Sequence, residues 1–112
     1  VGGSGQLGQT HCRLLTDYVE EHLSSDIGLD DLAAITGLTR FHFSRAFKAT
    51  FGEPPYQFVI RKRIERAQSM LAKTTLSVAE VAIACGFGSA SQLARSFRDV
   101  VGQTPLAFRR SA

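Results

Sequence analysis

Apolar residues recur at intervals of three and four along most of this chain, and the strict alternation typical of strands is nearly absent. Glycine and proline divide the pattern into segments of helical length, because glycine favours helix ends and proline favours first turns. The segments predict an all-α fold of about seven helices, at residues 10–23, 29–36, 40–51, 54–73, 78–85, 90–101 and from 104 onward.

The second half of the chain repeats the pattern of the first. Residues 29–37 match residues 78–86 at a shift of 49, and residues 43–48 match residues 93–98 at a shift of 50. Each copy contains a short helix, a glycine-containing turn and a longer helix, which is the helix-turn-helix pattern. Such regular coincidences indicate a duplicated structural unit.

The longer helix of each copy has one face for the core and one for solvent. In residues 40–51, Phe43 and Phe47 are predicted to be buried, which leaves an outward face formed by Phe41, Ser44, Arg45 and Lys48. In residues 90–101, the predicted buried stripe is Leu93, Phe97 and Val100, and the outward face contains Ser91, Ala94, Arg95 and Arg98. Both outward faces therefore place a mid-helix arginine and a later cation at matching positions.

A helix with such a face suits the major groove of DNA, where arginine binds guanine through two hydrogen bonds. Arg45 and Arg95 have an ordinary alternative as solvated surface residues, but the duplication and the charge distribution favour DNA contact. Phe41 either contacts thymine methyl groups or packs against the neighbouring helix, and both interpretations stay open. Lys48 and Arg98, near the helix ends, are expected at phosphates.

Capping sequences limit what some polar residues can do. Ser89 with Gln92 fits the pattern Ser-x-x-Gln, in which both side chains bind backbone N–H groups at a helix start. For Gln92 a structural use and a base contact both remain open. Ser77 with Glu80 forms a second such box, and there, as for His42, the structural role is favoured.

Charge is distributed unevenly along the chain, whose formal net charge is +3. Residues 1–39 contain one arginine against six acidic residues, a net −5, and residues 40–112 contain twelve Lys/Arg against four acidic residues, a net +8. A basic block of this size in a small helical domain indicates a polyanionic partner. The first helix, with Asp17, Glu20 and Glu21, is expected to face away from that partner, either for docking or only for solubility.

Other function classes find little support in the composition. The 112 residues suffice for one domain and contain no apolar run long enough to span a membrane. Cys12 and Cys85 form no disulfide framework and show no metal-ligand spacing with the histidines, so no cofactor is expected. Catalytic motifs are missing, so we expect no enzyme. The sequence also lacks the aromatic platforms typical of proteins that bind single-stranded RNA. The alternative to DNA binding is a helical interaction module that docks an acidic partner.

These residues resemble the AraC/XylS-type bacterial transcription regulators over nearly all of residues 10–110. The most specific part lies in the second copy and comprises Ile83-Ala84-Cys85-Gly86-Phe87-Gly88-Ser89, Phe97-Arg98, Gly102, Pro105 and Phe108-Arg109. The first copy is similar to the first helix-turn-helix of the family, through Leu32-Ala33, Gly37-Leu38-Thr39-Arg40, Phe47-Lys48 and Gly52.

The resemblance implies two helix-turn-helix subdomains, residues 10–53 and 74–112, joined by a linker helix at 54–73. The glycine-rich start of the chain separately predicts a flexible linker or expression scar at 1–9. It implies sequence-specific binding of double-stranded promoter DNA by a monomer, with two recognition helices in successive major grooves. Carried over by position, the DNA contacts fall on Arg40, Phe41, Ser44, Arg45 and Lys48 in the first unit, and on Ser89, Ala90, Ser91, Gln92, Arg95 and Arg98 in the second.

The chain departs from the family at Ala90 and Ala94, where many relatives have aromatic or large polar residues, and at Phe108, where tyrosine is usual. Base reading by the second helix is therefore expected to be sparse. Many members attach this domain to a sensor or dimerisation domain, so we expect the C-terminal piece of a longer cytoplasmic regulator that also contacts RNA polymerase. A short, stand-alone member is the alternative.

Overall fold

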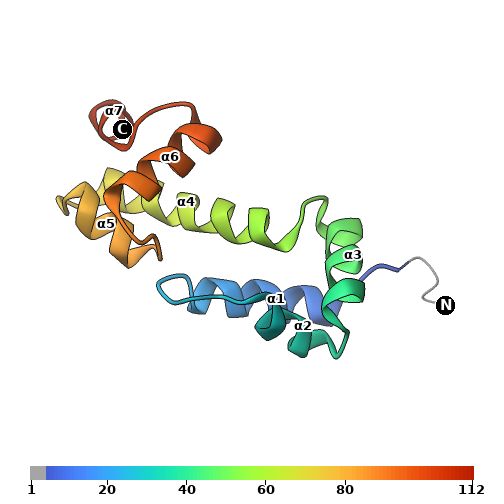
Figure 1. Cartoon of the computed structure of the whole chain (residues 1–112). Coiled ribbons are helices and arrows are strands. Elements are labelled where there is room, and N and C mark those ends of the chain that lie inside the picture. Colours follow the sequence, from blue (N-terminus) through green and yellow to red (C-terminus); the bar gives the residue numbers. More distant parts are fainter. Residues whose placement is uncertain (1–4) are drawn as a thin grey trace. The chain divides into compact units, whose positions relative to one another are not determined.

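The computed structural model describes residues 5–112 and contains, within them, seven α-helices and no strand (Figure 1). The helices are α1 (Gln9–Glu21), α2 (Leu29–Thr36), α3 (Arg40–Phe51), α4 (Pro55–Lys73), α5 (Val78–Ala84), α6 (Ala90–Val101) and α7 (Pro105–Ser111). The all-α prediction is confirmed. Part of the predicted linker at 1–9, namely residues 1–4, lies outside the described residues.

The chain forms two compact units. The first comprises residues 5–22 together with Ile27–Val59, and the second comprises Leu23–Asp26 and Ile60–Ala112. The helix predicted as a separate linker, α4, therefore belongs to both units. Its buried side chains supply both cores, and they are Phe58, Val59, Ile64, Ala67 and Leu71.

Phenylalanine rings from α3 and α4 form the centre of the first core. Phe43 and Phe47 have no exposed surface. The ring of Phe47 lies 4.2 Å from that of Phe51 and 5.4 Å from that of Phe58, measured between centroids. Full burial of a phenylalanine contributes about 1.5–3 kcal/mol. Because two such side chains lie on one stripe of α3, the opposite stripe of this helix is held toward solvent.

The segment before α1 contacts α3, although the sequence placed it in a linker. The backbone N–H of Leu7 donates to Thr50 Oγ1 at 2.8 Å, and the Thr50 hydroxyl donates to the Ala46 carbonyl at 2.8 Å. The Gln6 amide donates to the Ala49 carbonyl at 3.5 Å. The Thr50 hydroxyl thus accepts from the segment before α1 and donates to a backbone carbonyl of its own helix.

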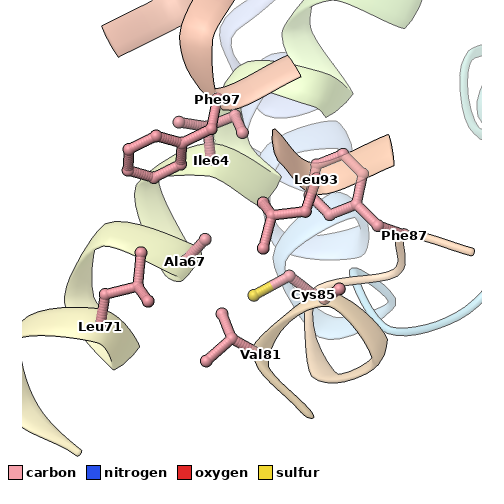
Figure 2. Packing of buried hydrophobic residues seen from close by; sticks show 9 residues of the cluster. Ile64, Ala67, Leu71, Val81, Cys85, Phe87, Leu93 and Phe97 are labelled. Carbon is pink, nitrogen blue, oxygen red and sulfur yellow. The ribbon is translucent and has the colours of Figure 1, made fainter. Parts of the chain in front are cut away.

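The second core lies among α4, α5 and α6 (Figure 2). Its fully or nearly fully buried residues are Ile64, Ala67, Leu71, Val81, Ala82, Cys85, Phe87, Leu93 and Phe97. The close-up shows the sulfur of Cys85 directed into this cluster, among the apolar side chains (Figure 2). Cys85 is therefore a free thiol buried in the core.

The predicted buried stripe of α6 is wrong at one position. Val100 is 48% exposed, whereas Val101 packs against the core. Phe108 of α7 packs on the same cluster and meets Phe97 edge-on, with ring centroids 5.5 Å apart. Val101 stands four residues after Phe97 and eight after Leu93, so it continues the same helical stripe toward the core.

The two copies of the repeat share their helix caps. Thr39 and Ser89 each accept a hydrogen bond at the start of the longer helix, from the backbone N–H of His42 and of Gln92. Gly52 and Gly102 end these helices in the left-handed conformation, with φ of 81° and 85°. The duplication inferred from the sequence is thus present in the capping interactions of both units.

The turn of the second copy closes on a segment from near the end of α1. At Gly86, φ is +89°, and a Cβ atom would overlap the backbone oxygen of Leu23. Arg63 of α4 donates to the same oxygen from Nε at 3.2 Å and to the Ser25 carbonyl from Nη2 at 2.8 Å. Segment Leu23–Asp26 is thereby fixed to the second unit through its backbone.

We expect Gly86→Ala to lower the free energy of unfolding by about 2–4 kcal/mol, because the new methyl group adds a collision to the left-handed strain. Gly102→Ala is the matched control, since its φ is +85° but no atom lies within 4 Å of the position that its new methyl group would take; it should cost about 1–2 kcal/mol. Urea unfolding followed by circular dichroism measures both. Equal losses would mean that the approach to Leu23 is unimportant.

Candidate nucleic-acid interface

The exposed face of α3 contains an aromatic ring and two cations. Phe41 is 64% exposed, and the guanidinium carbon of Arg45 lies 5.4 Å from the centroid of its ring. This distance is within the range of a cation–π interaction. Phe41 contacts two side chains of its own helix, Arg45 and the ring of His42, and most of its surface is exposed.

Arg40 lies at the start of the same helix but already has a partner. Its Nε donates to Asp30 Oδ1 of α2 at 2.6 Å, and both side chains are exposed, at 66% and 73%. An exposed ion pair of this kind contributes about 0–1 kcal/mol to stability. The pair connects the first turns of α2 and α3. Arg40 therefore contacts another helix, whereas Arg45 contacts Phe41 of its own helix.

Thr39 and His42 organise the beginning of α3. The Thr39 hydroxyl accepts from the backbone N–H of His42 at 3.3 Å and lies 2.9 Å from the Nδ1 of the same residue. His42 therefore has the structural role that the sequence favoured. Ser44 is half-buried, and Lys48 is exposed in the last turn.

The corresponding face of α6 is more apolar. Ser91, Arg95 and Arg98 are exposed, while Ala90 and Ala94 are half-buried beside them. Arg95 and Arg98 occupy the positions that Arg45 and Lys48 hold on α3, at a shift of 50. Each unit thus presents a mid-helix arginine and a cation in the last turn, as predicted.

The Gln92 side chain accepts a hydrogen bond from the turn before α6, but the donor is the backbone N–H of Gly88 and not that of Ser89, which the capping pattern predicts. Its Oε1 accepts from the backbone N–H of Gly88 at 3.0 Å, and its own backbone N–H donates to Ser89 Oγ at 3.1 Å. The carbonyl end of the amide is occupied, so paired hydrogen bonds to adenine, which use both ends, require this bond to break. The glycine at residue 88 leaves room for this approach, because a Cβ there would lie 3.1 Å from the same oxygen.

Several cations of the basic block have structural partners that sequence reasoning missed. Arg63 binds two backbone carbonyls, and Arg109 donates to the Leu71 and Thr74 carbonyls at 3.0 and 3.3 Å. Arg61 pairs with Glu65 one turn later at 3.0 Å. The net charge of a segment therefore overstates the number of cations that it offers to a ligand.

The described residues contain no cluster of three or more His, Cys, Asp or Glu residues that could hold a metal ion. Burial raises the pKa of the Cys85 thiol above its ordinary value, although Arg66 and Arg63 act in the opposite direction. Hydrogen bonds from the Ser77 N–H and hydroxyl lower the pKa of Glu80, which caps α5. Among these residues no helix has the length and hydropathy needed to cross a membrane.

Comparison with known proteins identifies the fold. Residues 32–111 match the family model of a helix-turn-helix domain. An AraC-type transcriptional regulator of Chromobacterium violaceum has the same fold, with a TM-score of 0.85 and 26% identity over 92% of each chain. The DNA-binding domain of AdpA, solved with a target DNA, gives a TM-score of 0.83 and 34% identity over 88% of this chain and 89% of that one.

The chain belongs to the AraC-type helix-turn-helix family. It is a DNA-binding domain of a transcription regulator, and the alternative of an interaction module is not favoured. Among curated relatives, the MmsAB operon regulatory protein of Pseudomonas aeruginosa is 37% identical over 83% of this chain and 30% of its own length. For the probable transcriptional regulator LumQ of Photobacterium leiognathi the values are 32%, 86% and 39%. This AraC-type chain therefore spans well under half of these relatives.

If Arg45 reads a base, Phe41→Ala should make it less selective, because the cation–π contact between the ring and the guanidinium is lost. We expect discrimination at one base pair to fall about two- to fivefold, the amount that an exposed cation–π contact supplies. Phe41→Tyr keeps the ring and should retain discrimination. Binding to duplexes with each base at that position measures the effect. A uniform loss for all sequences would mean that Phe41 does not orient Arg45.

Proposed function

We propose that α3 and α6 are the two recognition helices and that they bind successive major grooves of promoter DNA. The observation on which this proposal rests is the matched pair of exposed faces, with Arg45 and Lys48 on α3 and Arg95 and Arg98 on α6. Both helices have 12 residues and the same type of cap at each end. A duplicated unit that presents the same cations twice fits a ligand with a repeating anionic backbone.

Within each helix the two cations have different tasks. Arg45 and Arg95 lie mid-helix, where the planar guanidinium can reach a guanine edge with two hydrogen bonds. Lys48 and Arg98 lie in the last turn, where a cation meets phosphate oxygens and fixes the register. The first pair therefore determines sequence, and the second pair supplies affinity that depends on salt.

The remaining predicted contacts take supporting roles. Ser89 and Gln92 shape the start of α6, and Gln92 presents its amide N–H groups because its oxygen is occupied. Arg40 holds α2 to α3 through Asp30 and approaches phosphate from that pair. Ser44 and Ser91 contribute small polar contacts beside the arginines, and Phe41 orients Arg45.

We also propose the setting in which this binding operates. The family and fold are those of transcription regulators, and the mechanism proposed here needs neither a cofactor nor a catalytic step. The whole protein would act in the bacterial cytoplasm, with a sensor or dimerisation domain and RNA polymerase as further partners. The larger size of the curated relatives supports the additional domain.

One chain should protect two major-groove segments about one helical turn apart, without two-fold symmetry in the sequence. Both proposed recognition helices belong to the same chain, so no second copy is required. This can be tested by footprinting on a duplex selected from a random pool, at protein concentrations that keep the chain monomeric. A single protected segment, or a site that requires a palindrome, would contradict the proposal.

Arg45→Ala and Arg95→Ala should each cost about 1–3 kcal/mol of binding free energy and relax base preference in one half of the site. Lys48→Ala and Arg98→Ala should weaken all sequences alike and reduce the slope of log affinity against log salt by about one. Titrations at several salt concentrations, on the selected duplex and its single-base variants, separate the two classes. If all four variants changed only the slope, the assignment of base-reading residues would be wrong.

The acidic face of α1 should not contribute to DNA binding. Asp17, Glu20 and Glu21 are exposed, and carboxylates facing the duplex would slow association by repulsion. Replacing Asp17 by Asn and both glutamates by Gln should leave the footprint unchanged. If the face docks a further domain or RNA polymerase, a full-length regulator with these changes should bind its promoter and regulate a reporter poorly. Normal regulation would show that the face serves solubility alone.

A further inference from the structure

We propose that the second unit recognises thymine through its methyl group, which enters an apolar groove beside α6. The groove has a volume of about 400 Å³ and lies against Ala90, Ser91 and Ala94 of α6, Thr104–Leu106 at the start of α7, and Val78 of α5. This inference rests on the proposed DNA-binding function and specifies what the second recognition helix reads.

The lining of the groove determines the chemistry that it accepts. Ala90 and Ala94 present only methyl groups, and Pro105 and Leu106 extend the apolar wall. This apolar wall makes no hydrogen bond to a base edge, and of the two hydroxyls in the lining that of Thr104 already accepts from the Ala107 N–H at 3.1 Å, while that of Ser91 is exposed. The C5-methyl group of thymine is the apolar group that unmodified bases display in the major groove. Apolar contact with that methyl is therefore the base-specific interaction that the apolar wall of Ala90, Ala94, Pro105 and Leu106 permits.

DNA is the occupant because the groove continues the proposed DNA-binding face. Ala90, Ser91 and Ala94 belong to the lining and also lie on the side of α6 expected to approach the duplex. Arg95 and Arg98 follow on the same helix and are exposed, so phosphates are attracted to this side. Leu106, 52% exposed at the edge of the groove, becomes covered when a duplex lies against α6.

The first unit lacks this lining at the matching positions. At a shift of 50, the counterparts of Ala90, Ala94 and Leu106 are Arg40, Ser44 and Tyr56. Arg40 is held in an ion pair with Asp30, which places charge where α6 has a methyl group. The two units thus share cations but differ in this wall, and they read DNA by different contacts.

The experiment removes single methyl groups from the DNA. A duplex selected from a random pool is assigned to the two units with Arg45→Ala and Arg95→Ala, and each thymine in the half that responds to Arg95 is replaced by deoxyuridine. Burial of one methyl group corresponds to about 0.8 kcal/mol. We expect about fourfold weaker binding at one or two positions and no change at the others.

Protein variants connect that effect to the groove. Ala94→Ser adds a hydroxyl with little change in volume and should reduce the ratio of thymine to deoxyuridine affinity from about four toward one. Ala72→Ser, on an exposed position of α4, is the matched control and should leave the ratio unchanged. Circular dichroism checks that both variants keep their helix content.

Each alternative result has a distinct meaning. Equal binding of thymine and deoxyuridine throughout this half, or a selected half-site without thymine, would overturn the inference and leave the proposed function standing. The Leu106 amide could instead be protected from hydrogen exchange only when an added protein domain is bound, with thymine and deoxyuridine bound equally. That result would mean that the groove binds a protein partner, and it would also overturn the inference. Failure to bind any duplex would overturn the proposed function itself.

Discussion

Full burial of one apolar stripe on each of the helices α3 and α6 is the constraint on which the rest of this structure depends. Phe43 and Phe47 on α3, and Leu93 and Phe97 on α6, have no exposed surface. A helix that rotated about its axis would expose two large apolar side chains at a cost of several kcal/mol. The orientation of the opposite face is therefore a consequence of core packing, and so is the position of its arginines.

Periodicity and glycine placement were sufficient to predict the helices, the duplication and most of each outward face. Interactions between residues distant in sequence were not predictable in this way. Val100 and Val101 both stand at helical spacing from Phe97, and the packing of the core leaves Val100 exposed and covers Val101. The hydrogen bond from Leu7 to Thr50 was likewise not predictable, because the sequence of a glycine-rich segment does not indicate which side chain its backbone will bind.

The candidate interface shows the same division. Residue type and spacing located Arg45, Lys48, Arg95 and Arg98, since a helical face can be drawn from the sequence alone. The hydrogen-bond and ion-pair partners of individual side chains could not be predicted from the sequence, because they come from other helices or from the backbone. The pairing of Arg40 with Asp30 and the bond from Gly88 to Gln92 changed the roles of two predicted contacts. Charge composition cannot report such partners.

The capping interactions shared by the two copies have a consequence for how this protein can change over evolution. Helices α3 and α6 each have their own N-cap, terminal glycine and core, so the outward residues of one can vary without altering the other. Substitutions at distant, independent sites generally add in free energy. A regulator built in this way can acquire a new target by altering half of its binding site at a time, while the unchanged half maintains enough affinity for selection to act on the intermediate.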